Sequence, residues 1–305
     1  MSATLLSLND VRVEDTFAEA FPVVGTRLII TAANKELAHI AATEVSGYAS
    51  SVIACDAEAD IEREVEPGES PDGRPGYSVL VFGFTAKGLE KGCAGRVGQC
   101  VLTCATTACF NGFPLSEGSK RIRIGGQLRY FGDGFQISKK LGDRRLWRIP
   151  VMDGEFLCED HFGTFNGVGG GNLLIAGTSR DAALSATMDA VRAIRECPDV
   201  ALPFPGGFVR SGSKVGSRYA ALKASTNDKW CPTLRSQTET RLPDNAVAVY
   251  EIVIDGVNFD AVQLAMRTGL HTATTTDGIV LVSAGNYGGK LGKHHFHLRD
   301  LIEPV

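Results

Sequence analysis

The tetrapeptide Glu14-Asp15-Thr16-Phe17 returns 145 residues later, slightly altered, as Glu159-Asp160-His161-Phe162. The same spacing carries Leu28-Ile29-Ile30 onto Leu173-Leu174-Ile175 without a gap. Two separate matches at one offset indicate that the chain contains the same structural unit twice. We therefore expect an internally duplicated protein whose two halves share a fold.

Each copy of the repeat predicts a strand followed by a helix. In the first copy, residues 28–31 form a short apolar run, Asn34 is suited to cap a helix, and Gly47 can end it. In the second copy, residues 173–176 form the apolar run and Ser179 takes the capping position. Apolar residues recur at helical spacing after both caps, which supports a helix in each place.

A second pair of segments extends the repeat at a larger offset. Pro71-Asp72 precedes an apolar strand at residues 77–82, and Pro243-Asp244 precedes another at residues 247–254. A helical stripe follows each strand, and the three cysteines on the first stripe are expected to be small core residues. The offset has grown to 172, so the second copy has gained about 27 residues between the two blocks.

Two strand–helix units in each half fit a split βαβ arrangement. The sequence predicts an α+β fold, internally duplicated, with two ferredoxin-like lobes at residues 1–148 and 149–305. The main alternative is a doubly wound nucleotide-binding sheet, suggested by a glycine cluster at residues 167–171. These glycines precede a predicted strand, whereas a dinucleotide fingerprint follows a strand and opens a helix. The cluster is therefore interpreted as a bend or turn.

The composition narrows the classes of function. Of the 305 residues 44% are hydrophobic and 22% are charged, which is ordinary for a globular protein. A net charge of −4 without a basic patch argues against nucleic acid, and we expect neither a membrane span nor a secretion signal. The eight cysteines are scattered and lack the paired spacing of a zinc site. They are expected to be reduced thiols in a cytoplasmic protein.

Glu251 is the residue that most clearly departs from the pattern of the repeat. It stands in a predicted strand of otherwise apolar or aromatic residues, and at the offset of 172 it aligns with Val79. An ionised carboxylate there would be costly, so the group should be paired or keep its proton with a raised pKa. Such a group is a catalytic candidate. The alternatives are an edge-strand position or an ion pair with a basic residue such as Arg267.

Two polar, glycine-containing segments are candidates for binding a ligand. One is the additional material between Leu202 and Pro243, and the other follows a predicted strand at residues 283–292. Small residues let the backbone approach a ligand, and a glycine-rich turn with a lysine can hold a phosphate or a carboxylate. An ordinary surface loop is the alternative for the first segment. The candidate substrate-binding residues are Ser213, Lys214, Ser217, Ser225, Thr226, Asn227, Asp228, Asn286 and Lys290.

A histidine cluster near the C-terminus raises the question of a metal. Of His294, His295 and His297, only the last two should share a face of a strand. No acidic residue or cysteine lies nearby in the sequence at a spacing typical of a metal site. A solvated strand end is the favoured interpretation, and we expect no metal site.

The segments quoted above, together with several others, resemble the formylmethanofuran:tetrahydromethanopterin formyltransferase family. The similarity runs in order from about Val13 to Leu301, and several of its blocks are long and unusual in composition. The blocks that carry it begin at Glu14, Pro71, Phe131, Pro203, Ser213, Ala224, Tyr250 and Ser283.

The resemblance implies two α/β lobes, no prosthetic group, and homodimers that associate further as a dimer of dimers. It implies methanofuran and tetrahydromethanopterin as coenzyme substrates, and it places the essential glutamate of the family on Glu251. In bacterial members it also implies association with the hydrolase subunits of a formyltransferase/hydrolase complex.

The expected chemistry is reversible formyl transfer from formylmethanofuran, or a bacterial analogue, to N5 of the pterin. Attack would occur directly within a ternary complex, with a protonated Glu251 stabilising the tetrahedral oxyanion. Two alternatives are open: a non-catalytic structural subunit of a larger one-carbon complex, and a nucleotide-binding protein built on the glycine-rich turns.

Overall fold

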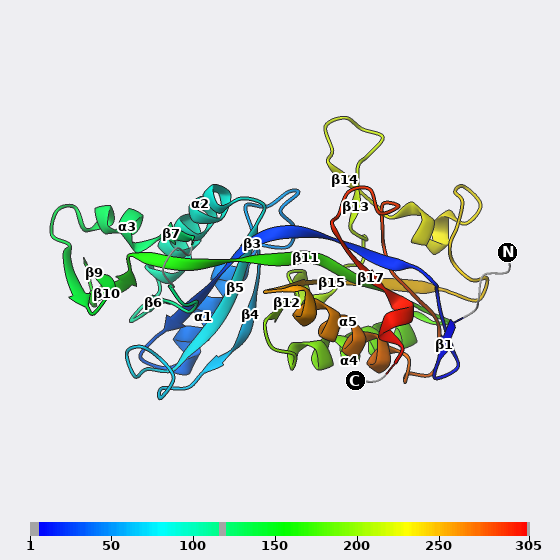
Figure 1. Ribbon diagram of the computed structural model, residues 1–305, viewed down its shortest axis with the longest axis horizontal. Helices are drawn as coiled ribbons and strands as arrows, with labels where there is room; N and C mark the ends of the chain where they lie inside the picture. Colours follow the sequence, from blue (N-terminus) through cyan, green and yellow to red (C-terminus); the bar gives the residue numbers. More distant parts are fainter. Residues whose placement is uncertain (1–5, 116–119, 304–305) are drawn as a thin grey trace. The chain divides into compact units, whose positions relative to one another are not determined.

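The computed structural model of the chain describes residues 6–115 and 120–303 and has mixed α+β architecture (Figure 1). It divides into two compact units. The central unit is Val23–Gly167, and the terminal unit combines the residues up to Pro22 with those from Val168 onward. Each unit is described by itself below.

These packing units differ from the lobes predicted from the sequence, which meet between residues 148 and 149. The reason is that two long strands, β3 (Phe17–Thr31) and β11 (His161–Gly177), each contribute residues to both units. The first residues of β3 therefore pack with the terminal unit, and residues 149–167 pack with the central unit. The boundary at 148 stays a prediction about the repeat, separate from the packing.

The central unit contains a sheet in the order β6-β3-β5-β4, in which all neighbouring strands are antiparallel. Along the chain, two of its strands are each followed by a helix that packs on the sheet, and the caps Asn34 and Gly47 predicted for the first helix are confirmed. The elements that follow β3 are α1 (Lys35–Ser46), β4 (Glu58–Val65), β5 (Gly76–Gly83), α2 (Ala86–Arg96) and β6 (Ala108–Asn111).

The terminal unit has the same strand order and directions, β16-β11-β15-β12. The predicted cap Ser179 is confirmed, since its hydroxyl accepts a hydrogen bond from the Ala182 N–H at 3.0 Å. The elements are α4 (Arg180–Arg195), β12 (Val200–Ala201), β15 (Ala248–Gly256), α5 (Phe259–Ala273) and β16 (Ile279–Ser283).

Further short elements complete each unit. In the central unit they are the π-helical turn η1 (Val97–Val101), β7 (Arg121–Arg123), α3 (Gly125–Leu128), η2 (Arg129–Gly132), β8 (Ile137–Leu141), β9 (Arg144–Val151) and β10 (Gly154–Glu159). In the terminal unit they are β1 (Leu6–Leu8), β2 (Val11–Val13), η3 (Pro205–Gly207), β13 (Lys214–Val215), β14 (Ala224–Ser225), η4 (Asp228–Trp230), η5 (Pro232–Leu234), β17 (His294–His297) and η6 (Leu298–Leu301).

The strand register corrects one detail of the predicted repeat. In the central unit Leu28 lies opposite Val79, whereas in the terminal unit its counterpart Leu173 lies opposite Ile252. The second offset is thus 173 within the strands, and the residue equivalent to Glu251 is Ser78 instead of Val79. One extra residue enters after Pro243-Asp244, and in a strand a shift of one residue moves a side chain to the other face.

This register places Glu251 on the face of the sheet that is turned away from the two helices. Ile252 and Ile254 pack with residues of α5, such as Val262 and Met266, in the main core of the terminal unit. Alternation along β15 sends Glu251 to the opposite face. There a second, smaller hydrophobic cluster forms, in which Trp230 and Leu242 of the additional segment pack on the sheet. The cluster consists of Leu174, Ala176, Trp230, Leu242, Ala246 and Leu281.

The glycine cluster lies inside β11, where the prediction placed a turn before a strand. The register of β11 against β15 shifts between Val168 and Gly171, and Gly170 has a φ of +93°. The cluster is therefore a bulge within a long strand, since glycine tolerates this backbone conformation.

The cysteines and histidines lie as follows. All eight cysteines are free thiols, and Cys93 is buried in the core of the central unit while Cys100 and Cys104 pack against that core. His295 and His297 share a face of β17 as predicted, because both rings contact Phe17.

Candidate active site around Glu251

Glu251 is almost completely buried, with 2% of its surface exposed, in the middle of β15. On one side β15 pairs with β11, and on the other the backbone groups of Glu251 exchange hydrogen bonds with Val209 at 3.1 and 2.7 Å. The edge-strand alternative is therefore wrong. The backbone of Glu251 is thus held on both sides by hydrogen bonds that do not involve its side chain.

Among residues 6–115 and 120–303, Ser213 alone donates hydrogen bonds to the carboxyl group of Glu251. The Ser213 N–H donates to Oε2 at 2.8 Å, and the Ser213 hydroxyl donates to Oε1 at 2.5 Å. Among the described residues no ion pair joins Glu251, and Arg267 instead donates to the backbone carbonyl of Asp300. The alternative of an ion pair with Arg267 is therefore also wrong.

Burial raises the pKa of Glu251, and the two hydrogen bonds from Ser213 oppose that shift without cancelling it. The net direction is the one expected for a carboxyl group moved from water into an apolar environment without a cation nearby. The group is thus biased toward its neutral, proton-donating form.

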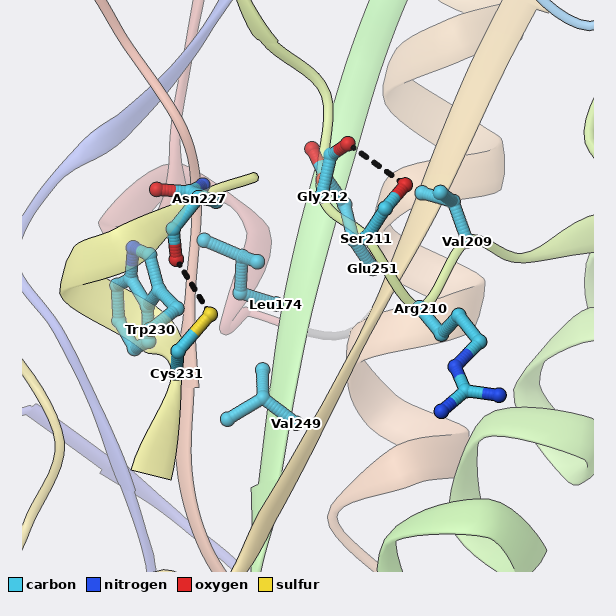
Figure 2. Close-up of a pocket in the computed structure, with 10 residues that line it drawn as sticks. All are labelled: Leu174, Val209, Arg210, Ser211, Gly212, Asn227, Trp230, Cys231, Val249 and Glu251. Atoms are coloured by element: carbon cyan, nitrogen blue, oxygen red, sulfur yellow. Dashed lines mark hydrogen bonds between the residues drawn. The ribbon is translucent and has the colours of Figure 1, made fainter. Parts of the chain in front are cut away.

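A hollow opens beside Glu251 between the sheet and the additional segment. Figure 2 shows Trp230, Cys231 and Asn227 on the segment side, with Leu174 and Val249 on the strands. Its complete lining is Leu174, Val209, Arg210, Ser211, Gly212, Asn227, Trp230, Cys231, Val249 and Glu251. The lining thus combines apolar side chains, such as Leu174, Trp230 and Val249, with polar or charged ones, such as Arg210, Asn227 and Glu251.

Most of the candidates in the additional segment lie on one hairpin and the turn after it. Strand β13 pairs with β14, so Lys214 lies opposite Ser225, and the hairpin stands away from the sheet (Figure 1). Lys214 forms an ion pair with Asp228, which holds the pKa of that carboxyl below its usual value. The two side chains thus satisfy each other's charge.

The remaining candidates of this segment make mostly local contacts. The Ser225 hydroxyl donates to the Gly216 carbonyl at 2.7 Å, and the Ser217 hydroxyl accepts from the Tyr219 N–H at 3.1 Å. Thr226 lies 3.4 Å from the sulfur of Cys231. Of all the candidates, only Ser213 and Asn227 are brought to Glu251 or to the hollow.

The second glycine-rich segment is held by a carboxylate of the chain itself. Glu19, on β3, accepts hydrogen bonds from four backbone N–H groups of residues 287–292. Asn286 donates to Thr16 and Phe17, while Lys290 is exposed. The amides of this turn bind a carboxylate of the chain itself, a contact that was not predicted, and binding of a substrate by Asn286 or Lys290 stays a prediction. The signal that could have pointed to Glu19 is the same as for Glu251, an acid flanked by apolar residues, here Ala18 and Ala20.

Neither a metal centre nor a membrane helix is found in the described part of the chain. Within residues 6–115 and 120–303, no three histidine, cysteine, aspartate or glutamate side chains gather as metal ligands would. Over the same ranges no helix is both long and apolar enough to cross a membrane.

Comparison with known proteins identifies the family. The family model described as "Formylmethanofuran-tetrahydromethanopterin formyltransferase" matches residues 6–151, and the one for its proximal lobe matches residues 154–301. The chain belongs to this family. The two matches also agree with a chain made of two sequence lobes.

Relatives from bacteria and archaea share about half of their residues with the chain. A formylmethanofuran–tetrahydromethanopterin formyltransferase of Methylococcus capsulatus is 54% identical, over 97% of this chain and 99% of the relative. One component of a formyltransferase/hydrolase complex from Methylorubrum extorquens is 53% identical, over 97% of each chain.

Two solved structures of the family match nearly the whole chain. The crystal structure of the Methylorubrum extorquens formyltransferase/hydrolase complex with methylofuran matches with a TM-score of 0.94 and 52% identity, over 99% of this chain and 100% of the other. The formyltransferase of Methanosarcina barkeri matches with a TM-score of 0.90 and 46% identity, over 97% of this chain and 100% of the other. The fold is therefore that of the family.

Proposed function

We propose that the chain transfers a formyl group between formylmethanofuran, or a bacterial analogue, and N5 of tetrahydromethanopterin. Relatives of that name are 46–54% identical over nearly the full length of the chain. The single structural observation that carries the proposal is the buried carboxyl group of Glu251, which Ser213 holds beside a hollow lined by both apolar and polar side chains. Both coenzymes act as substrates, and the reaction needs no prosthetic group.

In the proposed mechanism the N5 nitrogen attacks the formyl carbon of the donor amide. A carbon–nitrogen bond forms and the carbonyl electron pair moves to oxygen, giving a tetrahedral intermediate. The neutral acid of Glu251 donates a hydrogen bond to this oxygen, as carboxylic acids kept neutral by their surroundings do. The old carbon–nitrogen bond then breaks, and the departing amine carries the proton lost by N5.

The rate should depend on pH through Glu251. Because burial raises the pKa of Glu251, the neutral acid is present below that pKa and is lost as the pH rises through it. We expect turnover at saturating coenzymes to be level on the acidic side and to fall about tenfold per pH unit above the pKa. A rate that instead requires deprotonation of Glu251 would show that it acts as a general base.

Ser213→Ala should move the alkaline limb of the pH profile, where turnover falls as the pH rises, to higher pH. The Ser213 hydroxyl bond lowers the pKa of Glu251, so its removal leaves the effect of burial less opposed. The shift can be measured in the rate and, independently, by infrared titration of the Glu251 carboxyl band. Ser236→Ala is the matched control, since Ser236 is an exposed serine of the same insertion. A limb that stays in place would show that Ser213 does not tune Glu251.

The proposal extends to assembly, architecture and location. Strand order and directions that are the same in both units support two ferredoxin-like lobes, with the sequence boundary after residue 148. One relative is a subunit of a formyltransferase/hydrolase complex, which supports association of this chain with hydrolase subunits. A homotetramer built as a dimer of dimers, a role in one-carbon metabolism and a cytoplasmic location stay predictions of the sequence.

The decisive experiment is a formyl-transfer assay on the purified chain with both coenzymes. We expect formyl-tetrahydromethanopterin to accumulate, and omission of either coenzyme to abolish it. A folded chain that transfers no formyl group either alone or together with the hydrolase subunits would favour the structural-subunit alternative. The nucleotide-binding alternative is disfavoured because Glu19 occupies the glycine-rich turn, and a thermal-shift screen with nucleotides tests it.

A further inference from the structure

Glu19 is a buried anion enclosed by backbone amides. Only 2% of its surface is exposed, and its two oxygens accept from the N–H groups of Tyr287, Gly289, Leu291 and Gly292 at 2.6 to 2.8 Å. Burial alone would raise the pKa of Glu19, but these four bonds together hold it below its usual value. The carboxylate therefore stays charged and acts as a fixed anchor for the loop of residues 285–292.

The backbone of this loop is shaped for that anchor. Gly288 and Gly289 have φ values of +74° and +71°, a conformation that favours glycine, and they direct the Gly289 N–H to Glu19 while the Gly288 N–H binds the Asn286 side chain. A Cβ atom on Gly292 would lie 2.4 Å from the carbonyl oxygen of Ala20. The loop thus has one conformation imposed by Glu19 and by close contact with β3.

Tyr287 connects the anchored loop to the residue that holds Glu251. Its N–H is bound by Glu19, while its hydroxyl donates to the Ser213 carbonyl at 3.2 Å and accepts from the Val215 N–H at 3.4 Å. The hydroxyl therefore ties the backbone on both sides of Lys214. Ser213 in turn uses its own N–H and hydroxyl to hold the carboxyl group of Glu251.

We propose that Glu19 and Tyr287 are positioning residues for formyl transfer. Glu19 fixes the loop of residues 285–292, the Tyr287 hydroxyl fixes Ser213, and Ser213 aims the carboxyl group of Glu251. The inference rests on the proposed function and adds the supporting contacts that a preorganised donor requires. Ser213 belongs to a long insertion whose strands and helical turns span only two or three residues each, so its position depends on such contacts.

Tyr287→Phe tests the middle link with the smallest change. The ring remains, but the hydroxyl that holds Ser213 is lost. We expect turnover to fall about three- to tenfold with little change in KM, the size of effect that one neutral hydrogen bond gives. The alkaline limb should move to higher pH, as in Ser213→Ala. Tyr48→Phe is the control, because Tyr48 is an exposed tyrosine of the central unit.

A double-mutant cycle shows whether Tyr287 acts through Ser213. If it does, Tyr287→Phe should cost less in a Ser213→Ala background than in the wild type, because only the Ser213 N–H is then left to be positioned, and the two losses in turnover should not fully add. Fully additive losses, or an unchanged rate and pH profile in Tyr287→Phe, would overturn the inference.

Glu19→Gln tests the anchor itself. The glutamine side chain keeps the size but replaces one acceptor oxygen by an NH₂ group that meets N–H donors. Hydrogen exchange should accelerate in peptides that cover residues 285–292 but not in α5, and turnover should fall at least as far as in Tyr287→Phe. Normal protection of the loop would contradict the anchoring role of Glu19.

The infrared band of Glu251 separates this inference from the proposed function. If the wild-type chain transfers no formyl group but the carboxyl band still titrates at higher pH in Tyr287→Phe, the function is wrong and the positioning holds. If the wild type is active and the band does not move, the positioning is wrong and the function holds.

Discussion

Glu251→Ala should lower turnover by a hundred- to a thousandfold while the fold remains intact. Loss of one donor to a developing oxyanion costs about 2.7–4 kcal/mol of transition-state stabilisation. The side chain lies on the sheet face away from the main helical core, and in the described part of the chain its carboxyl group is held by Ser213 alone. Its removal therefore frees two polar groups of the insertion without opening the core. Single-turnover rates with both coenzymes give the loss, and circular dichroism monitors the fold.

Glu251→Gln is the matched variant, because an amide can still donate a hydrogen bond. We expect its loss to be smaller than that of the alanine variant, and its alkaline limb to disappear because the titrating group is gone. Near-normal turnover in Glu251→Ala would rule out the oxyanion role.

The second large effect concerns stability and lies in the central unit. Arg27 binds Glu62 with two hydrogen bonds of 2.7 and 2.6 Å, and their side chains are only 17% and 7% exposed. Arg27→Met would leave the Glu62 carboxylate in place without this cation. We expect the free energy of unfolding to fall by about 1–3 kcal/mol, since the ion pair is only partly buried and the Ser78 hydroxyl still donates to the Glu62 carboxylate. Urea denaturation measures it.

Arg27→Met/Glu62→Met is the control for this prediction. Replacing both partners removes the uncompensated charge, so most of the lost stability should return. If the single and double variants are equally destabilised, the loss comes from packing and the charge of Glu62 is not its cause.

Much of the fold could be predicted because the helix caps and apolar runs of short segments agree with the strands and helices of the folded units. Asn34 and Ser179 are helix caps in equivalent places, and the apolar runs before them are the central strands of the two sheets. Glu251 was recognisable because an acid within an apolar strand departs from a pattern that otherwise follows burial. These features depend on residues close together in the chain.

What could not be predicted depends on contacts between distant segments. The position in the first repeat that corresponds to Glu251 is Ser78 and not Val79, because of one extra residue. Only the register of the strand pairing shows this. Glu19 meets its loop across about 270 positions of sequence, and no spacing marks that contact. Lys214 was a candidate for binding substrate, but the sequence does not show that an ion pair with Asp228 neutralises the charge of Lys214.

The absence of an ion pair at Glu251, among the residues that the structure describes, has a consequence for inhibitor design. Compounds with an amidine or ammonium group are the usual choice against an active-site carboxylate, yet here they would meet an acid biased toward its neutral form, with Arg210 in the lining of the same hollow. A tetrahedral phosphinate or a sulfonamide offers an oxygen acceptor where the intermediate carries its charge. Potency of such compounds should weaken in alkaline solution, as Glu251 loses the proton that it would share with them.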